Sequence, residues 1–129
     1  MNRFEPQKLF TREGYWRFDN ADGVEFIAHG DASRHELLWR VIDELETVQA
    51  KAIHLLESFM KDSGEFDLGT VTVLPEKSDD GADFFLSFGF FADRDKHEYT
   101  YTYFHVFFGD ARDHPHPQFW PCKFTIGFH

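Results

Sequence analysis

The last third of the chain is crowded with aromatic residues that recur at every second position. Tyrosine alternates with threonine from Tyr99 to Tyr103, and Phe and Trp are dense in the segments 84–91 and 119–128. Aromatic and β-branched side chains at period two suit a pleated strand whose surface is half buried. The pattern therefore predicts an aromatic-rich sheet. Its strands are expected at 66–74, 83–91, 98–108 and 119–128.

An amphipathic helix is predicted before these strands, between residues 33 and 62. Apolar residues recur there three or four positions apart, starting with Leu38, which places them on one helix face. Ser33 and Glu36 have the spacing of a capping box, and Gly64 is expected to end the helix. At ~1.5 Å per residue, one uninterrupted helix of this length would cross a whole sheet diagonally.

The segments 15–18 and 24–28 flank the turn-forming residues 19–23 and predict an N-terminal β-hairpin. Short links between the later strands favour an antiparallel meander, and the phase change across Gly69 predicts a bulge. We therefore expect a single α+β domain over residues 1–129. Its N-terminal hairpin would be followed by one long amphipathic helix, packed on a mainly antiparallel sheet that ends in a four-stranded meander.

Alternation also assigns faces to the last two predicted strands. Within 119–128, the even-numbered residues from Trp120 to Phe128, Cys122 among them, are expected to face the core. Within 98–108, the side that carries Phe104 is expected to be buried. The residues left on the opposite face of that strand are Tyr99, Tyr101, Tyr103 and His105.

This tyrosine row is the best candidate for a binding surface. Tyrosine offers rigid contact area with one polar tip, which is the chemistry of interface hot spots and of ligand pockets. Packing of the same row beneath the hairpin or the helix is the alternative. The row consists of Tyr99, Tyr101, Tyr103 and His105.

The chain carries 23 acidic and 13 basic residues, for a formal net charge of −10. Such a field repels phosphate backbones, and no cluster of Lys or Arg offsets it, so nucleic-acid binding is not expected. The acidic loops either keep the protein in solution or match a basic protein partner. The loop residues expected to contact such a partner are Asp93, Asp95, Asp110 and Asp113.

The segment from Gly109 to Pro117 holds the densest group of polar side chains. His114 and His116, with Asp110 and Asp113 nearby, could offer nitrogen and oxygen ligands to zinc, although the alternating prolines would hold the two imidazoles apart. This loop, with Tyr101, Tyr103 and His105, gives an alternative function: a small-molecule or metal-binding domain, possibly enzymatic.

No motif for a catalytic nucleophile, a phosphate-binding loop or a dinucleotide is present, so we expect a non-enzymatic protein without a cofactor. Cys122 could act as a nucleophile beside His105, but its predicted place on an apolar strand face favours a packed, protonated thiol. The single cysteine excludes an internal disulfide framework. The start of the chain lacks the pattern of a signal peptide, and no apolar run approaches the ~18 residues of a membrane helix. A cytoplasmic monomer or homodimer is expected.

The segment from Asp67 to Leu74, which follows a long amphipathic helix, resembles small acidic bacterial immunity proteins of polymorphic or contact-dependent toxin systems. That resemblance implies binding and blocking of a cognate toxin, often a basic nuclease. The predicted element order is also similar to cystatin-like folds, but the Gln-x-Val-x-Gly loop of the protease inhibitors is absent. The curved sheet is similar as well to the nuclear-transport-factor-2-like group, which would imply a ligand-binding or enzymatic cone.

Overall fold

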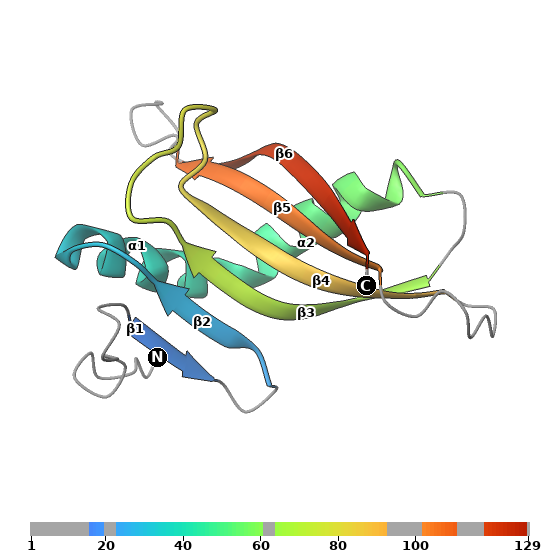
Figure 1. Ribbon diagram of the computed structural model, residues 1–129, viewed down its shortest axis with the longest axis horizontal. Coiled ribbons are helices and arrows are strands. Elements are labelled where there is room, and N and C mark those ends of the chain that lie inside the picture. Colours follow the sequence, from blue (N-terminus) through green and yellow to red (C-terminus); the bar gives the residue numbers. More distant parts are fainter. Residues whose placement is uncertain (1–15, 20–22, 61–63, 93–101, 111–117, 129) are drawn as a thin grey trace.

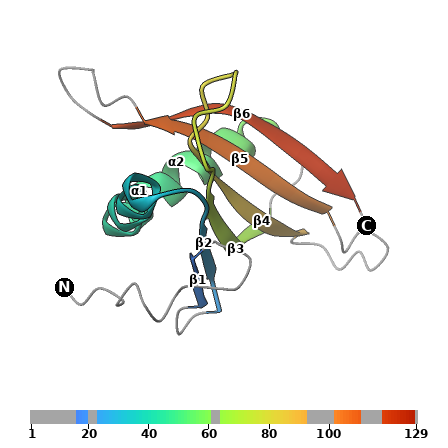
Figure 2. The same cartoon turned by 60° about the vertical axis from the view of Figure 1, so that its left-hand side comes forward.

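The computed structural model describes residues 16–19, 23–60, 64–92, 102–110 and 118–128. Within these residues one six-stranded sheet carries two helices on one of its faces, so the predicted α+β class is confirmed (Figures 1 and 2). The helices are α1 (Ala32–Asp43) and α2 (Leu45–Glu57). The strands are β1 (Trp16–Asp19), β2 (Glu25–Ala28), β3 (Gly64–Val73), β4 (Phe84–Ala92), β5 (Thr102–Asp110) and β6 (Phe119–Phe128).

The strands lie side by side in chain order, from β1 at one edge to β6 at the other. β3, β4, β5 and β6 pair antiparallel with their neighbours, whereas β2 pairs parallel with β3 across the helical connection. The sheet is therefore mixed and extends beyond a four-stranded meander. β1 pairs antiparallel with β2, with Trp16 opposite Ala28. Tyr15 and residues 20–22 of the predicted hairpin lie outside the described residues.

The prediction of one long helix is wrong, because the helix breaks at Glu44. The backbone of Glu44 has φ −110° and ψ 17°, and α2 begins at the next residue. α1 packs on β2 and β3, while α2 runs in a different direction and reaches β6 (Figure 1). A straight helix would leave a twisted sheet at one end. The bend at Glu44 keeps both segments on the sheet, a requirement that the apolar periodicity does not reveal.

The predicted helix ends are also corrected. Asp31 caps α1, since its carboxylate accepts hydrogen bonds from the backbone N–H of Ser33 at 3.0 Å and from the Ser33 hydroxyl at 2.6 Å. These hydrogen bonds lower the pKa of Asp31. Ser33 lies inside the helix, so it forms no capping box with Glu36. At the other end α2 stops at Glu57, and Gly64 begins β3.

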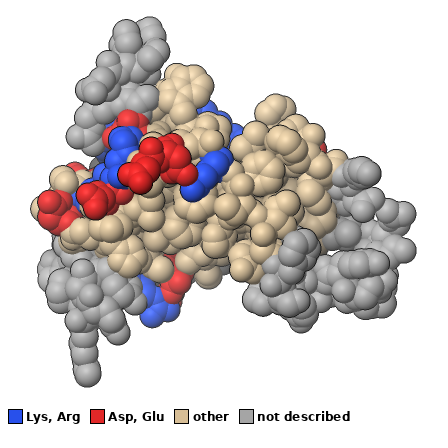
Figure 3. Space-filling view, turned by 45° about the horizontal axis from the view of Figure 1, so that its top comes forward, with Lys and Arg blue, Asp and Glu red and all other residues tan. Residues whose placement is uncertain are grey.

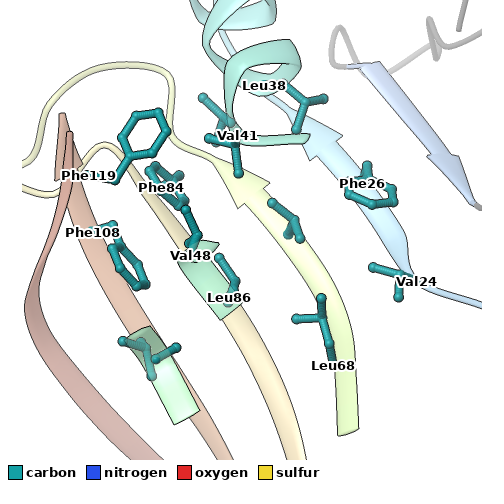
Figure 4. Close-up of a cluster of buried hydrophobic side chains, with 14 of the residues drawn as sticks. Val24, Phe26, Leu38, Val41, Val48, Leu68, Phe84, Leu86, Phe108 and Phe119 are labelled. Atoms are coloured by element: carbon teal, nitrogen blue, oxygen red, sulfur yellow. The ribbon is translucent and has the colours of Figure 1, made fainter. Parts of the chain in front are cut away.

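The hydrophobic core lies between the helices and the sheet. In Figure 4 the helix residues Leu38, Val41 and Val48 lie over side chains that come from the strands. The expected burial of Phe104 is confirmed, with Val106 and Phe108 on the same face, and Trp39 is buried as well. The other residues labelled in the same close-up are Val24, just before β2, and the strand residues Phe26, Leu68, Phe84, Leu86, Phe108 and Phe119.

The predicted bulge in β3 is confirmed, because the pairing register with β4 shifts between Leu68 and Thr70. The predicted burial of β6 is wrong for much of the strand. Trp120 is 46% exposed and Ile126 is 49% exposed, and Cys122 is exposed as well. β6 is an edge strand, and its register against β5 shifts between Phe107 and Phe108. This shift reverses the alternation, so that Phe119 is buried in place of Trp120, and the helices cover too little of this edge to bury Ile126.

A buried carboxylate joins the loop before β4 to α1 and β5. The side chain of Asp83 is 3% exposed and forms ion pairs with Arg34 at 3.1 Å and Lys77 at 2.5 Å. It also accepts a hydrogen bond from the backbone N–H of Asp110 at 2.8 Å. Burial raises the pKa of Asp83, but the hydrogen bonds from Lys77 and Asp110 outweigh burial and leave that pKa below its usual range. Asp83 is therefore a charged structural centre.

Candidate functional site

The sheet face opposite the helices is open, since no described helix lies on it (Figure 2). We call it the outer face. Pairing of β3, β4, β5 and β6 places its residues in rows across the sheet. One row is Thr72, Phe85, Phe107 and Lys123. The next row is Thr70, Ser87, His105 and Thr125, and the third is Asp67, Gly89, Tyr103 and Gly127.

Four rings gather at the centre of the outer face: Phe85, Tyr103, His105 and Phe107, here called the outer aromatic cluster. Phe85 stacks on His105 with centroids 5.1 Å apart and contacts Phe107 at 4.9 Å. Tyr103 lies 5.2 Å from His105. All four side chains are partly exposed. A set of rings that hold one another in place and still reach solvent is a preorganised contact surface.

A glycine on the neighbouring strand makes room for Tyr103. Gly89 of β4 and Gly127 of β6 are its cross-strand neighbours. A Cβ atom at Gly127 would overlap the Tyr103 ring, so this ring lies across the neighbouring strand. The arrangement leaves Tyr103 flat against the sheet beside His105.

Burial lowers the pKa of His105. A group with an ordinary pKa of about 6.5 that is shifted downward is neutral at pH 7. His105 therefore contributes an uncharged ring to the cluster, and the cluster presents an apolar surface with two polar tips.

The charges around the cluster divide into paired and unpaired groups. At one end of the outer face Lys123 pairs with Asp80 at 2.5 Å and lies 4.7 Å from the Phe107 ring. At the other end Glu65 and Asp67 of β3 are exposed, and neither forms an ion pair with the described residues. Figure 3 shows Lys, Arg, Asp and Glu gathered at one part of the surface beside a broad area without them. The outer face thus joins an aromatic centre to free carboxylates.

The structure brings together some of the predicted site residues and separates others. Tyr103 and His105 are neighbours, as predicted. Asp110 is not free for a partner, because it forms a two-pronged ion pair with Arg40 at 2.8 and 3.3 Å. This pairing raises the pKa of Arg40. The predicted site residues outside the described part are Tyr99, Tyr101, Asp93, Asp95, Asp113, His114 and His116.

Within the described ranges, no three His, Cys, Asp or Glu side chains come together as a metal site would require. The metal ligands expected at His114 and His116 stay a prediction. Cys122 is exposed and lies 3.6 Å from the carbonyl of Gly81, and burial of its sulfur raises the pKa of the thiol. Its neighbours thus come from the loop before β4, while the neighbours of His105 are the rings of the outer aromatic cluster.

Sequence reasoning missed Phe85 and Phe107 as members of the cluster. A signal for Phe85 was present in the sequence, because segment 84–91 is apolar on both faces. In the part of the chain that the structure describes, only one of these two faces is covered by helices. Sequence reasoning also missed Arg40, which pairs with Asp110 and lies 5.1 Å from the Phe119 ring.

No helix in the described part of the chain is long and apolar enough to cross a membrane. Comparisons of this chain with protein-family models, with curated proteins and with solved structures found no match.

Proposed function

We propose that this chain is a non-enzymatic protein-binding domain that holds a basic protein on its outer face. The observation that carries the proposal is the outer aromatic cluster, bordered by the exposed carboxylates of Glu65 and Asp67. In its most concrete form the protein is an immunity protein that neutralises a cognate toxin, as the resemblance to that group implies.

The aromatic centre supplies the contact energy in this proposal. Tyr and Phe bury large areas with few rotatable bonds, and interface hot spots are enriched in such rings near the middle of the contact. Ring contacts already restrain Phe85, Tyr103 and His105 in the free protein. The entropic cost of ordering them on binding is therefore small.

The acidic charge and the carboxylates of Glu65 and Asp67 steer a basic partner and raise its association rate. A net charge of −10 raises the encounter rate with a basic protein, and the effect weakens as salt shortens the Debye length. Glu65 and Asp67 lie on the strand next to β4, so a basic side chain of a partner seated on the cluster would reach them. Such rim charges act mainly on the association rate and on its salt dependence.

Neutralisation of a toxin requires only that the complex cover the toxin's working surface. No catalytic group is needed on this side of the interface. A small acidic domain with a rigid aromatic face suits that role physically.

The test begins with capture of the tagged protein from its native lysate at low and at high salt. A basic protein that co-purifies at low salt is then purified. Its affinity is measured for the wild-type chain and for two test variants and two control variants. Tyr103→Ala is expected to weaken binding by roughly tenfold to a hundredfold, as loss of a hot spot does. Asp67→Asn is expected to slow association and to reduce the salt dependence.

Matched controls come from outside the outer aromatic cluster and its neighbouring carboxylates. Trp120→Ala removes an exposed aromatic ring on β6, and Asp79→Asn removes an exposed loop carboxylate. Both controls are expected to bind like the wild type. Equal affinity of Tyr103→Ala and Trp120→Ala, together with binding that salt does not change, would refute the proposal.

A small-molecule site on the same cluster is the second candidate, because the partly exposed rings of Phe85 and His105 form a platform on which a flat ligand can stack. A thermal-shift screen with metabolites separates the two readings. Stabilisation by a metabolite that disappears in Tyr103→Ala would favour this second candidate.

A further inference from the structure

The two edges of the sheet differ in how well they are protected. β1 is four residues long and carries Arg17 and Asp19. β6 is ten residues long, pairs only with β5 among the described strands, and carries Lys123 as its one charged residue. Native proteins protect sheet edges with short strands and charges, because free backbone groups invite another strand. Pro121 and the register shift beside it protect the start of β6, so the segment from Lys123 to Gly127 is the least protected edge among the described strands.

Apolar side chains line this exposed edge. Ile126 is 49% exposed, and Phe59, just after α2, is 63% exposed. The Phe59 ring lies 4.9 Å from Phe124 of β6, so helix end and strand form one continuous strip. A hollow of about 470 Å³ adjoins the strip at the start of β6. Its lining residues are Lys51, His54, Leu55, Ser58, Trp120 and Pro121.

The charge pattern selects the partner for this edge. The chain has 23 acidic residues, yet none of them lies on β6. The charged groups that contact β6 are Lys51, whose ammonium lies 5.5 Å from the Trp120 ring, and Lys123 on the strand, which pairs with the exposed loop residue Asp80. A basic protein therefore gains nothing by docking here. A second copy of this acidic chain, which is repelled over most of its surface, meets little repulsion along β6.

We propose that β6 pairs antiparallel with β6 of a second copy around a two-fold axis near Thr125. Pairing about such an axis places even-numbered residues opposite even-numbered ones and odd-numbered residues opposite odd-numbered ones. Each face of one sheet therefore continues into the same face of the other. Phe124 then lies opposite the second copy's Ile126, which is a favourable aromatic–aliphatic pair. Lys123 lies opposite Gly127, so the two lysines do not face each other directly.

The helices of both copies lie on the same side of the joined sheet in this dimer. The strips around Phe59 meet across the axis and lose their exposure. The outer aromatic clusters stay uncovered on the opposite side, so the dimer neither requires nor blocks the proposed partner.

The test is light scattering on the full chain during size-exclusion chromatography, over a wide range of protein concentration. The expected mass is twice the chain mass of 15.2 kDa. Because no acidic residue lies on β6 itself, added salt is expected to maintain or strengthen the dimer, whereas it weakens a complex with a basic partner.

Two variants and one matched control test the edge. Ile126→Lys and Phe59→Glu place charges in the strip at positions that are already exposed, and each is expected to raise the dissociation constant of the dimer by roughly tenfold or more. Phe91→Lys makes the same kind of change at an apolar residue of β4 that is 55% exposed. It is expected to leave the mass at that of the dimer.

A monomeric wild type at every concentration would overturn the proposal. So would a variant series in which Phe91→Lys dissociates the dimer and Ile126→Lys does not. Melting curves show that each variant is folded. Affinity for the basic partner, measured on Ile126→Lys, separates the two proposals, because loss of the dimer is expected to leave that affinity unchanged.

Discussion

The ring of Tyr103 lies over the backbone of Gly127 on the neighbouring strand, in the space that a Cβ atom at position 127 would need. β6 therefore contributes to the outer aromatic cluster by the absence of a side chain. The position of the Tyr103 ring therefore depends on a glycine that is one strand away.

Gly127→Ala is expected to push the Tyr103 ring away from the sheet. Overpacking costs about 1 kcal/mol or more where the neighbour cannot yield, but this ring is partly exposed and can swing outward. The larger effect is therefore expected on partner affinity, with a loss similar to that of Tyr103→Ala. NMR shifts of the Tyr103 ring report the displacement.

Gly69→Ala is the control for this change. Its added methyl would have its nearest neighbour, the carbonyl oxygen of Ser87, at 3.8 Å. Unchanged Tyr103 shifts in Gly127→Ala would contradict the described position of the ring.

Lowered histidine pKa values predict a pH dependence of stability. Burial lowers the pKa of His105 and of His35 in the folded chain. At pH values between the lowered pKa of the folded chain and the ordinary histidine pKa of about 6.5, the unfolded chain binds protons that the folded chain does not bind. Each histidine therefore destabilises the fold as pH falls through ~6.5, and this loss stops once the folded pKa is reached.

His105→Phe keeps a ring in the cluster and removes one of these titrating groups. The difference in free energy of unfolding, wild type minus variant, is expected to decrease as the pH is lowered from about 7.5 to about 5, a range that spans the ordinary histidine pKa. Urea unfolding at several pH values measures the difference. An NMR titration of the His105 imidazole with a midpoint above the ordinary value would contradict the expected burial.

Loss of the Asp83 charge is expected to be costly. Asp83→Asn leaves the guanidinium of Arg34 without its buried carboxylate and removes the ion pair with Lys77. Breaking a buried pair costs about 3 kcal/mol or more. Urea unfolding measures the loss. Because the pKa of Asp83 is lowered, its contribution is full above pH ~4 and disappears as pH falls through the folded pKa.

Asp80→Asn provides the comparison for Asp83. Asp80 lies three positions earlier in the same loop, and both it and its partner Lys123 are solvent-exposed. Exposed ion pairs contribute little, so the urea midpoint is expected to change hardly at all. Equal losses in the two variants would show that the burial of Asp83 does not matter.

A double-mutant cycle on Arg40 and Asp110 is expected to give a coupling energy of about 1 to 2 kcal/mol. The ion pair has two hydrogen bonds, and the Asp110 side chain is nearly buried. The same cycle on Arg17 and Glu25, which form an exposed pair, is expected to give a few tenths of a kcal/mol. A coupling between Arg40 and Asp110 no larger than that control would mean that the pair does not hold α1 to β5.

Local pattern predicted much of this fold correctly. Period-two alternation located the strands and the buried side of β5, because adjacent residues of a strand must point to opposite faces. The phase change at Gly69 located the bulge in β3. The outer aromatic cluster was half predicted: Tyr103 and His105 were recognised, but Phe85 and Phe107 were not, since both faces of an apolar strand look alike in sequence.

What the sequence determined by itself was the α+β class, the alternation of faces and the strongly acidic charge, because these properties depend on residues a few positions apart or on a sum. The tertiary structure decided which strand lies at an edge, where the helix bends, and which charges are neutralised. Alternation assigned Ile126 to the core face, yet only coverage by a helix would have buried it. Asp110 was predicted to be free for a partner, yet it pairs with Arg40, which lies 70 residues away in the chain. Such pairings depend on how separate elements pack, and no local spacing encodes them.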